Sequence, residues 1–165
     1  MNADSRSRRN VMTRLAGAFS AIGVAGLMSG TALAKKQESV QKLNRDGKTA
    51  DGTQMITPLI IHNGLIYIAG QGANSNGQVG KDDIDSHTTK VMENVKQLVE
   101  VGGGSMDSIL QLTVFLADLT HYDAMNKIFK TYFPHGGPAR TTVAVAGLPG
   151  NSLIEINCIA AVTRK

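Results

Sequence analysis

The sequence predicts an α+β fold, in which a mixed β-sheet carries two helices on one face. Two apolar runs around Asn63-Gly64 give the strongest short-range signal for a β-hairpin. Strand-like and helical patterns follow in the order ββ-α-β-α-ββ, and helices between strands imply crossover connections with some parallel pairing. Residues 136–162 read as two more apolar strands joined by a Gly/Pro turn, which implies an antiparallel pair. We therefore expect one sheet layer covered by one helix layer.

Residues 1–34 have the composition of an export signal. Residues 5–14 are basic, whereas residues 15–34 carry no charge and end in the small-x-small pattern Ala32-Leu33-Ala34. The pair Arg8-Arg9 before the apolar run resembles a twin-arginine signal. We therefore expect cleavage after Ala34 and a periplasmic protein with no stable membrane insertion. Retention of the apolar run as a membrane anchor stays open as the alternative.

The positive charge of the chain belongs mostly to this leader. The whole chain has a net charge of +4, of which residues 1–34 hold +3, so the mature part from Lys35 holds only +1. No basic patch interleaved with aromatic residues remains in that part. Its charge therefore argues against nucleic acid as a partner.

The cysteine and histidine pattern indicates neither a disulfide nor a metal site. Cys158 is the only cysteine, and we expect it to be a small buried hydrophobic residue. The histidines are scattered without the spacing of zinc ligands: His62, His87, His121 and His135.

The first part of the mature chain divides into a linker and a hairpin. Residues 35–53 are polar and lack periodicity, which predicts a flexible linker before a domain at 54–165. Strands are expected at about 55–61 and 65–69, followed by a loop rich in glycine and asparagine.

A first helix is predicted from Asp85 to the glycine run Gly102-Gly103-Gly104. Asp85 or Ser86 can cap its N-terminus, and glycine accepts the left-handed conformation that ends a helix. The buried face follows helical spacing: Val91, Val95, Leu98 and Val99.

The second half of the domain predicts a strand at 109–116 and a helix at 119–133. Thr120 and Asp123 resemble a capping box at the start of that helix. An apolar stripe is expected to pack on the sheet as core: Tyr122, Met125, Phe129, Tyr132 and Phe133. Strands at about 140–146 and 153–162 complete the fold. The sheet face without helices is too apolar for open solvent, so we expect another subunit there, over Val143, Val145, Leu153 and Ile159.

The last two strands contain one cation, Arg140, and one anion, Glu155, in otherwise apolar sequence. The spacing "PAR" followed fifteen residues later by "LIEI", together with "GLIYIAGQ" and "YDAMNKIFKTYF", resembles the RidA/YjgF family over about residues 64–162. This resemblance implies a chorismate-mutase-like fold. It also implies a homotrimer, whose sheets form a central barrel and whose clefts lie between neighbouring subunits.

The resemblance further implies hydrolysis of reactive enamines and imines to 2-oxo acids and ammonia, without metal or organic cofactor. In that chemistry Arg140 would anchor the substrate carboxylate, because a guanidinium binds a carboxylate bidentately. Glu155 would be catalytic, orienting the water and moving protons. The alternatives stay open: Arg140 as part of an interface ion pair, and Glu155 as a solvent-facing residue or one that only orients Arg140.

Three more residues stand at substrate-binding positions of the family. Asn126, in "DAMNKIF", and Gly70, which precedes Gln71 after a strand, match the family. The chain departs from the family in three places. Thr142 stands where some enamine deaminases have a cysteine, Ala69 stands where the family has serine, and "MITPLIIHNG" has no tyrosine. Two other functions therefore stay open, a non-catalytic binding module for small carboxylates or 2-oxo acids and a holdase-like interaction protein.

Overall fold

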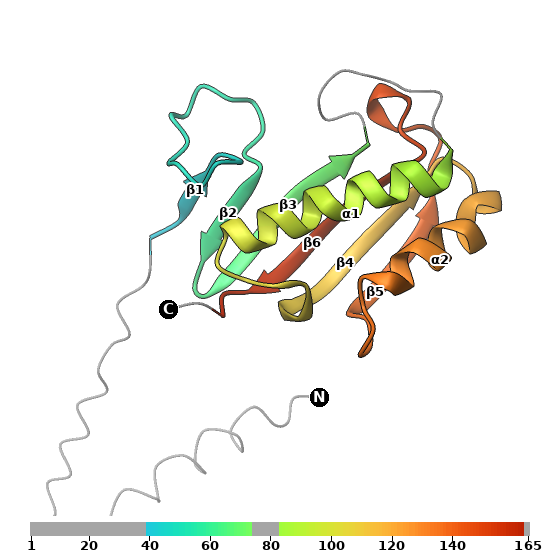
Figure 1. The fold of residues 1–165 in the computed structure, drawn as a ribbon. Coiled ribbons are helices and arrows are strands. Elements are labelled where there is room, and N and C mark those ends of the chain that lie inside the picture. Colours follow the sequence, from blue (N-terminus) through green and yellow to red (C-terminus); the bar gives the residue numbers. More distant parts are fainter. Residues whose placement is uncertain (1–38, 74–82, 164–165) are drawn as a thin grey trace, which may run out of the picture. The chain divides into compact units, whose positions relative to one another are not determined.

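The protein forms one mixed six-stranded sheet with both helices on one face (Figure 1), in a computed structural model that describes residues 39–73 and 83–163. The strands lie in the order β1-β2-β3-β6-β4-β5. Their bounds are β1 Gln41–Leu43, β2 Leu59–His62, β3 Leu65–Gly72, β4 Ile109–Leu116, β5 Ala139–Ala144 and β6 Ile154–Ala161. The helices are α1 Ile84–Val101 and α2 Tyr122–Thr131. The predicted α+β fold is confirmed.

The last two strands do not pair with each other, so the predicted C-terminal hairpin is wrong. β5 lies at the sheet edge and pairs in parallel with β4, because α2 carries the chain back to the starting end of the sheet. β6 is inserted between β3 and β4 and is antiparallel to both. Every second residue of β6 is buried, as suits a central strand, whereas β5 holds Thr141 and Thr142 and suits an edge.

Helix α1 has the predicted buried face but a different cap. Asp83, rather than Asp85 or Ser86, is the N-cap, and its side chain accepts a hydrogen bond from the Ser86 backbone N–H at 2.9 Å. The helix ends at Val101 with Gly102 as its C-cap, and Gly103 follows with a φ of 86°. All four predicted face residues are fully buried: Val91, Val95, Leu98 and Val99.

Helix α2 begins after a short 3-10 turn, Leu119–His121, and its predicted capping box does not form. Asp118 instead accepts from the Thr120 backbone N–H at 2.7 Å. Within the predicted apolar stripe Met125, Phe129 and Phe133 are buried, but the side chain of Tyr122 is 40% exposed. Tyr122 is therefore not a core residue.

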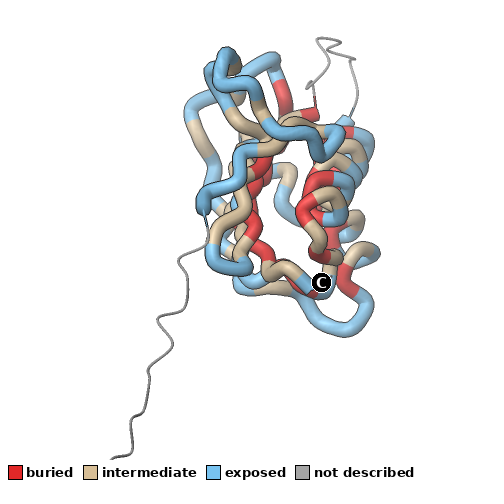
Figure 2. The backbone as a smooth tube through the Cα atoms, turned by 90° about the vertical axis from the view of Figure 1, so that its left-hand side faces the viewer, coloured by how far each residue is buried: buried red, intermediate tan, exposed pale blue. Residues whose placement is uncertain are grey.

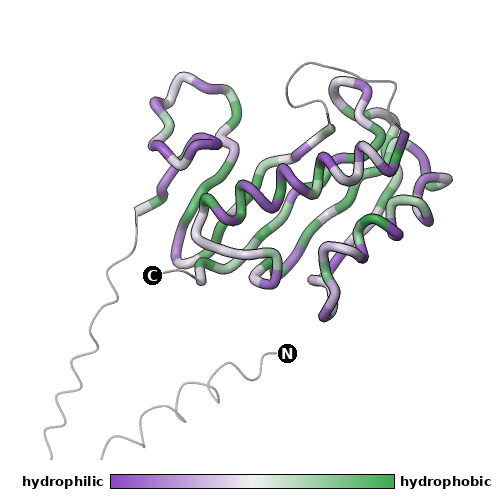
Figure 3. Tube along the Cα trace, viewed as in Figure 1, coloured by the Kyte–Doolittle hydropathy of each residue, from purple (hydrophilic) through white to green (hydrophobic). Residues whose placement is uncertain are grey.

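The core lies between the sheet and the two helices. Figure 2 shows the buried backbone of both layers facing inward, and Figure 3 shows hydrophobic residues concentrated on the central strands. Apolar side chains of α1 and α2 pack there on alternate residues of β3, β6 and β4, among them Ile66, Ile156 and Leu112.

The prediction of a flexible linker at residues 35–53 is wrong for residues 39–53, which the structure describes. Residues 41–43 form β1 and pair antiparallel with β2, and Arg45 donates a hydrogen bond to Gln71. A three-residue strand is too short to show periodicity, and its stability comes from backbone pairing rather than from an apolar face. The export signal predicted at residues 1–34 lies outside the described residues. Within 39–73 and 83–163, no helix is long and apolar enough to cross a membrane.

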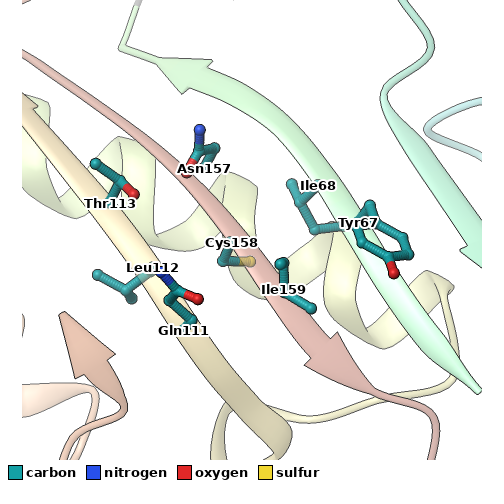
Figure 4. A pocket seen from close by; sticks show the side chains of 8 residues that line it. All are labelled: Tyr67, Ile68, Gln111, Leu112, Thr113, Asn157, Cys158 and Ile159. Carbon is teal, nitrogen blue, oxygen red and sulfur yellow. The ribbon is translucent and has the colours of Figure 1, made fainter. Parts of the chain in front are cut away.

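The sheet face opposite the helices is open in the single chain. Of the residues predicted to need cover, Val143 is 39% exposed, and the other three are half-buried. Figure 4 shows a hollow across β3, β6 and β4, whose rim on this face includes Tyr67, Gln111 and Asn157. The open face is a mixed surface of apolar and polar side chains.

Candidate active site

Arg140 lies on β5 and points toward helix α2. It pairs with Leu112 of β4, which is 1% exposed in the core, and paired residues of neighbouring strands share a face. The Arg140 guanidinium carbon is 4.6 Å from the centroid of the Phe129 ring and 5.8 Å from that of Tyr122. Its Nη2 donates a long hydrogen bond of 3.4 Å to the Tyr122 hydroxyl. Two aromatic rings of α2 thus hold the cation in place.

The guanidinium of Arg140 has no carboxylate partner among the described residues. The ion pair found in that part of the chain joins Lys48 to Asp46 on the surface. A guanidinium has five N–H donors in a planar fork, and the single bond to Tyr122 uses one of them. The remaining donors are available to a planar anion from outside the chain.

Two other predicted site residues lie beside Arg140. Thr142 follows two residues later on the same face of β5, and its buried hydroxyl oxygen has no hydrogen-bond partner in the described structure. Asn126 lies one helical turn after Tyr122 on α2 and one turn before Phe129, so the three share a helix face. We call Arg140, Thr142 and Asn126, with the two rings, the arginine site.

The aromatic residues of this site were missed as functional residues by the sequence analysis. Tyr122 and Phe129 were interpreted only as core, because an apolar stripe at helical spacing is usually core. Their separation of seven residues was the available signal. It places both rings on one helix face, and that face lies against the strand that begins with Arg140.

Glu155 lies on β6 and points to the opposite, open face of the sheet. Its neighbours Ile154 and Ile156 are fully buried, and alternation along the strand turns Glu155 away from them, as predicted. Its carboxylate covers the backbone of Gly70 on β3. A Cβ atom added at Gly70 would overlap with Glu155 and lie 2.9 Å from its Cδ. A side chain at position 70 would therefore have to displace the Glu155 carboxylate.

The β3 strand has a bulge beneath Glu155. The pairing of β3 with β6 shifts between Ile68 and Gln71, so Ala69 and Gly70 share one position of the ladder. The side-chain amide of Gln71 donates to the carbonyl oxygens of Ala69 at 2.7 Å and Gly70 at 3.1 Å. We call Glu155, Gly70 and this bulge the glutamate site.

The arginine and glutamate sites do not meet within one chain. β4 separates β5 from β6, and the side chains of Arg140 and Glu155 leave opposite faces of the sheet. Arg140 pairs with Leu112 of β4 and Glu155 with Phe115 of β4, so the two residues are two strands apart across the sheet and three residues apart along it. At the usual spacings of a β-sheet, their Cα atoms are roughly 14 Å apart. The predicted residues thus fall into two half-sites, since β5 and β6 are not paired.

Cys158 is a buried structural residue, as predicted. It is 4% exposed and unpaired, and burial raises the pKa of its thiol to about 12. A thiol with such a pKa is protonated at neutral pH and is not a nucleophile. Within the described ranges, no group of three or more His, Cys, Asp or Glu side chains could hold a metal ion.

The chain belongs to the family described as endoribonuclease L-PSP, whose model matches residues 53–162. A RutC family protein of Pyrococcus abyssi is 38% identical over 98 residues, which cover 58% of this chain and 77% of that protein. The chloroplastic Reactive Intermediate Deaminase A of Arabidopsis thaliana is 34% identical over 100 residues, covering 59% of this chain and 54% of that one.

Solved structures of the same family have this fold. The YjgF gene product of E. coli superposes with a TM-score of 0.63 at 27% identity, covering 74% of this chain and 98% of that one. E. coli TdcF, whose structure contains bound serine, superposes with a TM-score of 0.64 at 25% identity, covering 74% and 98%. The family resemblance and its chorismate-mutase-like fold are confirmed.

Proposed function

We propose that the protein hydrolyses reactive 2-imino and 2-enamino acids to 2-oxo acids and ammonia. The observation that carries this proposal is Arg140, a guanidinium held on the Phe129 ring with no carboxylate partner in the described structure. A 2-imino acid has a planar carboxylate beside its C=N bond. The guanidinium fork binds that carboxylate bidentately and so fixes the orientation of the C=N bond.

Glu155 supplies the proton transfers. On the protonated imine, its carboxylate takes a proton from water as the water oxygen bonds to the imine carbon and the C=N π electrons move to nitrogen. Glu155 returns that proton to the amino group of the resulting carbinolamine, and the C–N bond breaks to release ammonia. Glu155 then takes the hydroxyl proton as the carbon–oxygen double bond of the 2-oxo acid forms, and the released ammonia takes that proton from Glu155. Acid–base assistance of this kind contributes about 10²- to 10⁴-fold in rate. An enamine enters the same route after protonation at carbon to the imine.

The site is completed between copies of the chain in a homotrimer. Arg140 and Glu155 leave opposite faces of the sheet, so one chain cannot bring both to one small substrate. The open face contains Glu155 and exposes Val143 and Tyr67, which supports a subunit interface there. In this arrangement Arg140 of one copy and Glu155 of the next face one cleft.

The relatives support this substrate class. A deaminase of reactive intermediates, from Arabidopsis thaliana, is 34% identical, and the E. coli relative TdcF contains serine, a small molecule with a carboxylate. The family description names an endoribonuclease. The net charge of +1 for residues 35–165 does not favour a polyanionic substrate, so we do not propose that activity here.

A second candidate function is a non-catalytic binding module for small carboxylates or 2-oxo acids. The serine in TdcF favours it, as does the separation of Glu155 from Arg140 within one chain. This function needs the arginine site only.

The discriminating experiment is a Glu155→Gln variant, assayed with a generator of 2-iminopropionate or 2-iminobutyrate. If the protein is a deaminase, the Glu155→Gln variant should still bind 2-oxobutyrate, and its turnover should fall about 100-fold or more. Glu100→Gln, an exposed carboxylate on α1, is the matched control and should retain full turnover. Wild-type protein that releases 2-oxo acid no faster than buffer would support the binding module instead.

A further inference from the structure

The segment after β1 forms a closed turn next to the glutamate site. The Asn44 backbone N–H donates to the Lys48 carbonyl at 2.8 Å, and the Gly47 N–H donates to the Asn44 carbonyl at 3.0 Å. This turn lies before residue 53, where the match to the family model begins.

Arg45 extends from this turn to the side chain of Gln71. Its Nη2 donates to Gln71 Oε1 at 2.5 Å. Arg45 is half-buried, and no described carboxylate forms an ion pair with it. Gln71 is 2% exposed and lies on the helix-covered side of β3, where it pairs with Ile156.

The charge of Arg45 determines which way the Gln71 amide is turned. A guanidinium can only donate hydrogen bonds, so the oxygen of the amide must face Arg45. The amide nitrogen must then face the carbonyl oxygens of Ala69 and Gly70, and it donates to both, at 2.7 and 3.1 Å. With the amide reversed, nitrogen would face a cation and oxygen would face two carbonyls. Every polar atom of this buried amide has a partner in the observed orientation only.

These bonds connect the turn to the catalytic carboxylate. Gln71 holds the carbonyls of the bulge, and the Gly70 backbone within the bulge is the surface on which the Glu155 carboxylate lies. Because a hydrogen bond from a cation polarises the amide that accepts it, Arg45 also strengthens the bonds that Gln71 donates.

We propose that Arg45 is a positioning residue for Glu155, acting through Gln71 and the β3 bulge. This inference rests on the proposed function, in which Glu155 moves the protons. Arg45 does not contact the substrate. Its effect is therefore on turnover, while carboxylate binding by Arg140 at the other half-site is unchanged.

The test compares Arg45→Met, which keeps an apolar stem but no donor, with Arg45→Lys, which keeps a charge and a donor. Lys48→Met is the control, because Lys48 belongs to the same turn and its side-chain ion pair with Asp46 is on the surface. We expect Arg45→Met to lower kcat about 10- to 100-fold, as small misplacements of a catalytic group do. The Kd for 2-oxobutyrate should stay within about twofold, Arg45→Lys should recover part of kcat, and Lys48→Met should match the wild type.

A second measurement separates this proposal from the proposed function. In protein labelled at the glutamate side-chain carboxyl, NMR reports the surroundings of the Glu155 carboxylate whether or not turnover occurs. We expect Arg45→Met to shift the Glu155 carboxyl resonance and the Gly70 amide resonance, and Lys48→Met to shift neither. Unchanged resonances of both groups in folded Arg45→Met would overturn the positioning role. A parallel loss of 2-oxobutyrate binding and of thermal stability would also overturn it, since that pattern marks a general structural role.

Discussion

The carboxylate of Glu155 lies on the backbone of Gly70, in the space that a side chain at position 70 would fill. Position 70 belongs to the β3 bulge, so an extra residue in one strand creates the surface for a carboxylate on the next. The two residues are 85 positions apart in the sequence and meet only because β6 is inserted beside β3.

A methyl group at position 70 should therefore displace Glu155. We expect Gly70→Ala to lower turnover about 10-fold or more and to leave 2-oxobutyrate binding intact, because the Arg140 half-site is on another strand and the other face. Overpacking of this kind costs about 1–3 kcal/mol of stability when the neighbour cannot move away, and Glu155 is a side chain that can. Steady-state kinetics and calorimetry measure the two effects.

Gly147→Ala is the matched control for that variant. No atom lies within 4 Å of a Cβ placed at Gly147, so this substitution should leave turnover unchanged. If Gly70→Ala retained full turnover as well, Glu155 would not need its observed position, and its catalytic role would be wrong.

Elements with strong local signals were predictable from the sequence. The β4 strand, predicted at roughly 109–116, spans Ile109–Leu116, and the buried face of α1 followed from helical spacing. Arg140 and Glu155 became candidate site residues because they are isolated charges in apolar strands, and their roles stay predictions. Helix α1 in particular needs no partner to reveal which of its faces is buried.

Features that depend on pairing between distant residues were not predictable. Nothing in the sequences of β5 and β6 alone indicates that β6 pairs with β3 instead of with β5. The end of β3 at Gly72 lies 82 residues before the start of β6 at Ile154. The β1 strand has three residues and no apolar periodicity, so only its backbone bonds to β2 reveal it. The same limit hid Arg45, whose role appears only when Gln71 is beside it.

Substitution of Arg140 should separate its charge from its shape. Arg140→Ala should weaken 2-oxobutyrate binding by about 2–5 kcal/mol if the pair is desolvated. Arg140→Lys should restore only part of this, because an ammonium offers a point charge where the guanidinium offers a planar fork over the Phe129 ring. Isothermal titration gives both values. Full rescue by lysine would show that the bidentate geometry is not used.

The hydroxyl of Tyr122 should make a small contribution to the same binding. Its bond to Arg140 Nη2 is long, at 3.4 Å, and Tyr122→Phe keeps the ring beside the guanidinium. We expect carboxylate binding to weaken about two- to threefold, at the lower end of the value of a hydrogen bond. Tyr132→Phe is the control, since the Tyr132 hydroxyl donates to Glu93 at 2.8 Å instead of contacting Arg140. Carboxylate binding by the Tyr132→Phe variant should be unchanged.

Export stays a prediction that a direct experiment can check. If residues 1–34 are a twin-arginine signal, the protein purified from its native host should begin at Lys35 and be found in the periplasm. Replacement of Arg8-Arg9 by two lysines should leave uncleaved precursor in the cytoplasm. Normal processing of this variant would rule out the twin-arginine route, and membrane-bound full-length protein would favour the anchor.

Assembly should decide whether the two half-sites work together. We expect light scattering to give three times the monomer mass, because the open sheet face needs cover and Arg140 and Glu155 cannot meet within one chain. Ile159→Asp, on the open face, should dissociate the trimer and abolish turnover while the fold is kept. Gln97→Asp, exposed on α1 at the opposite side of the molecule, should change neither property.

Mixed trimers test the shared cleft directly. Trimers of Arg140→Ala chains alone, or of Glu155→Gln chains alone, should have little turnover. In a mixed trimer, a cleft built from two copies is intact wherever Arg140 of a Glu155→Gln chain faces Glu155 of an Arg140→Ala chain. With equal amounts and random assembly, about a quarter of the clefts meet this condition, so co-expression should restore about a quarter of wild-type turnover. The two kinds of chain have different affinity tags, and purification on both tags in turn yields trimers that contain both kinds. The measurement is kcat per trimer, corrected for the removal of trimers made of one kind of chain only. If both residues acted within one chain, every cleft in the mixture would lack one of them, and no activity would return.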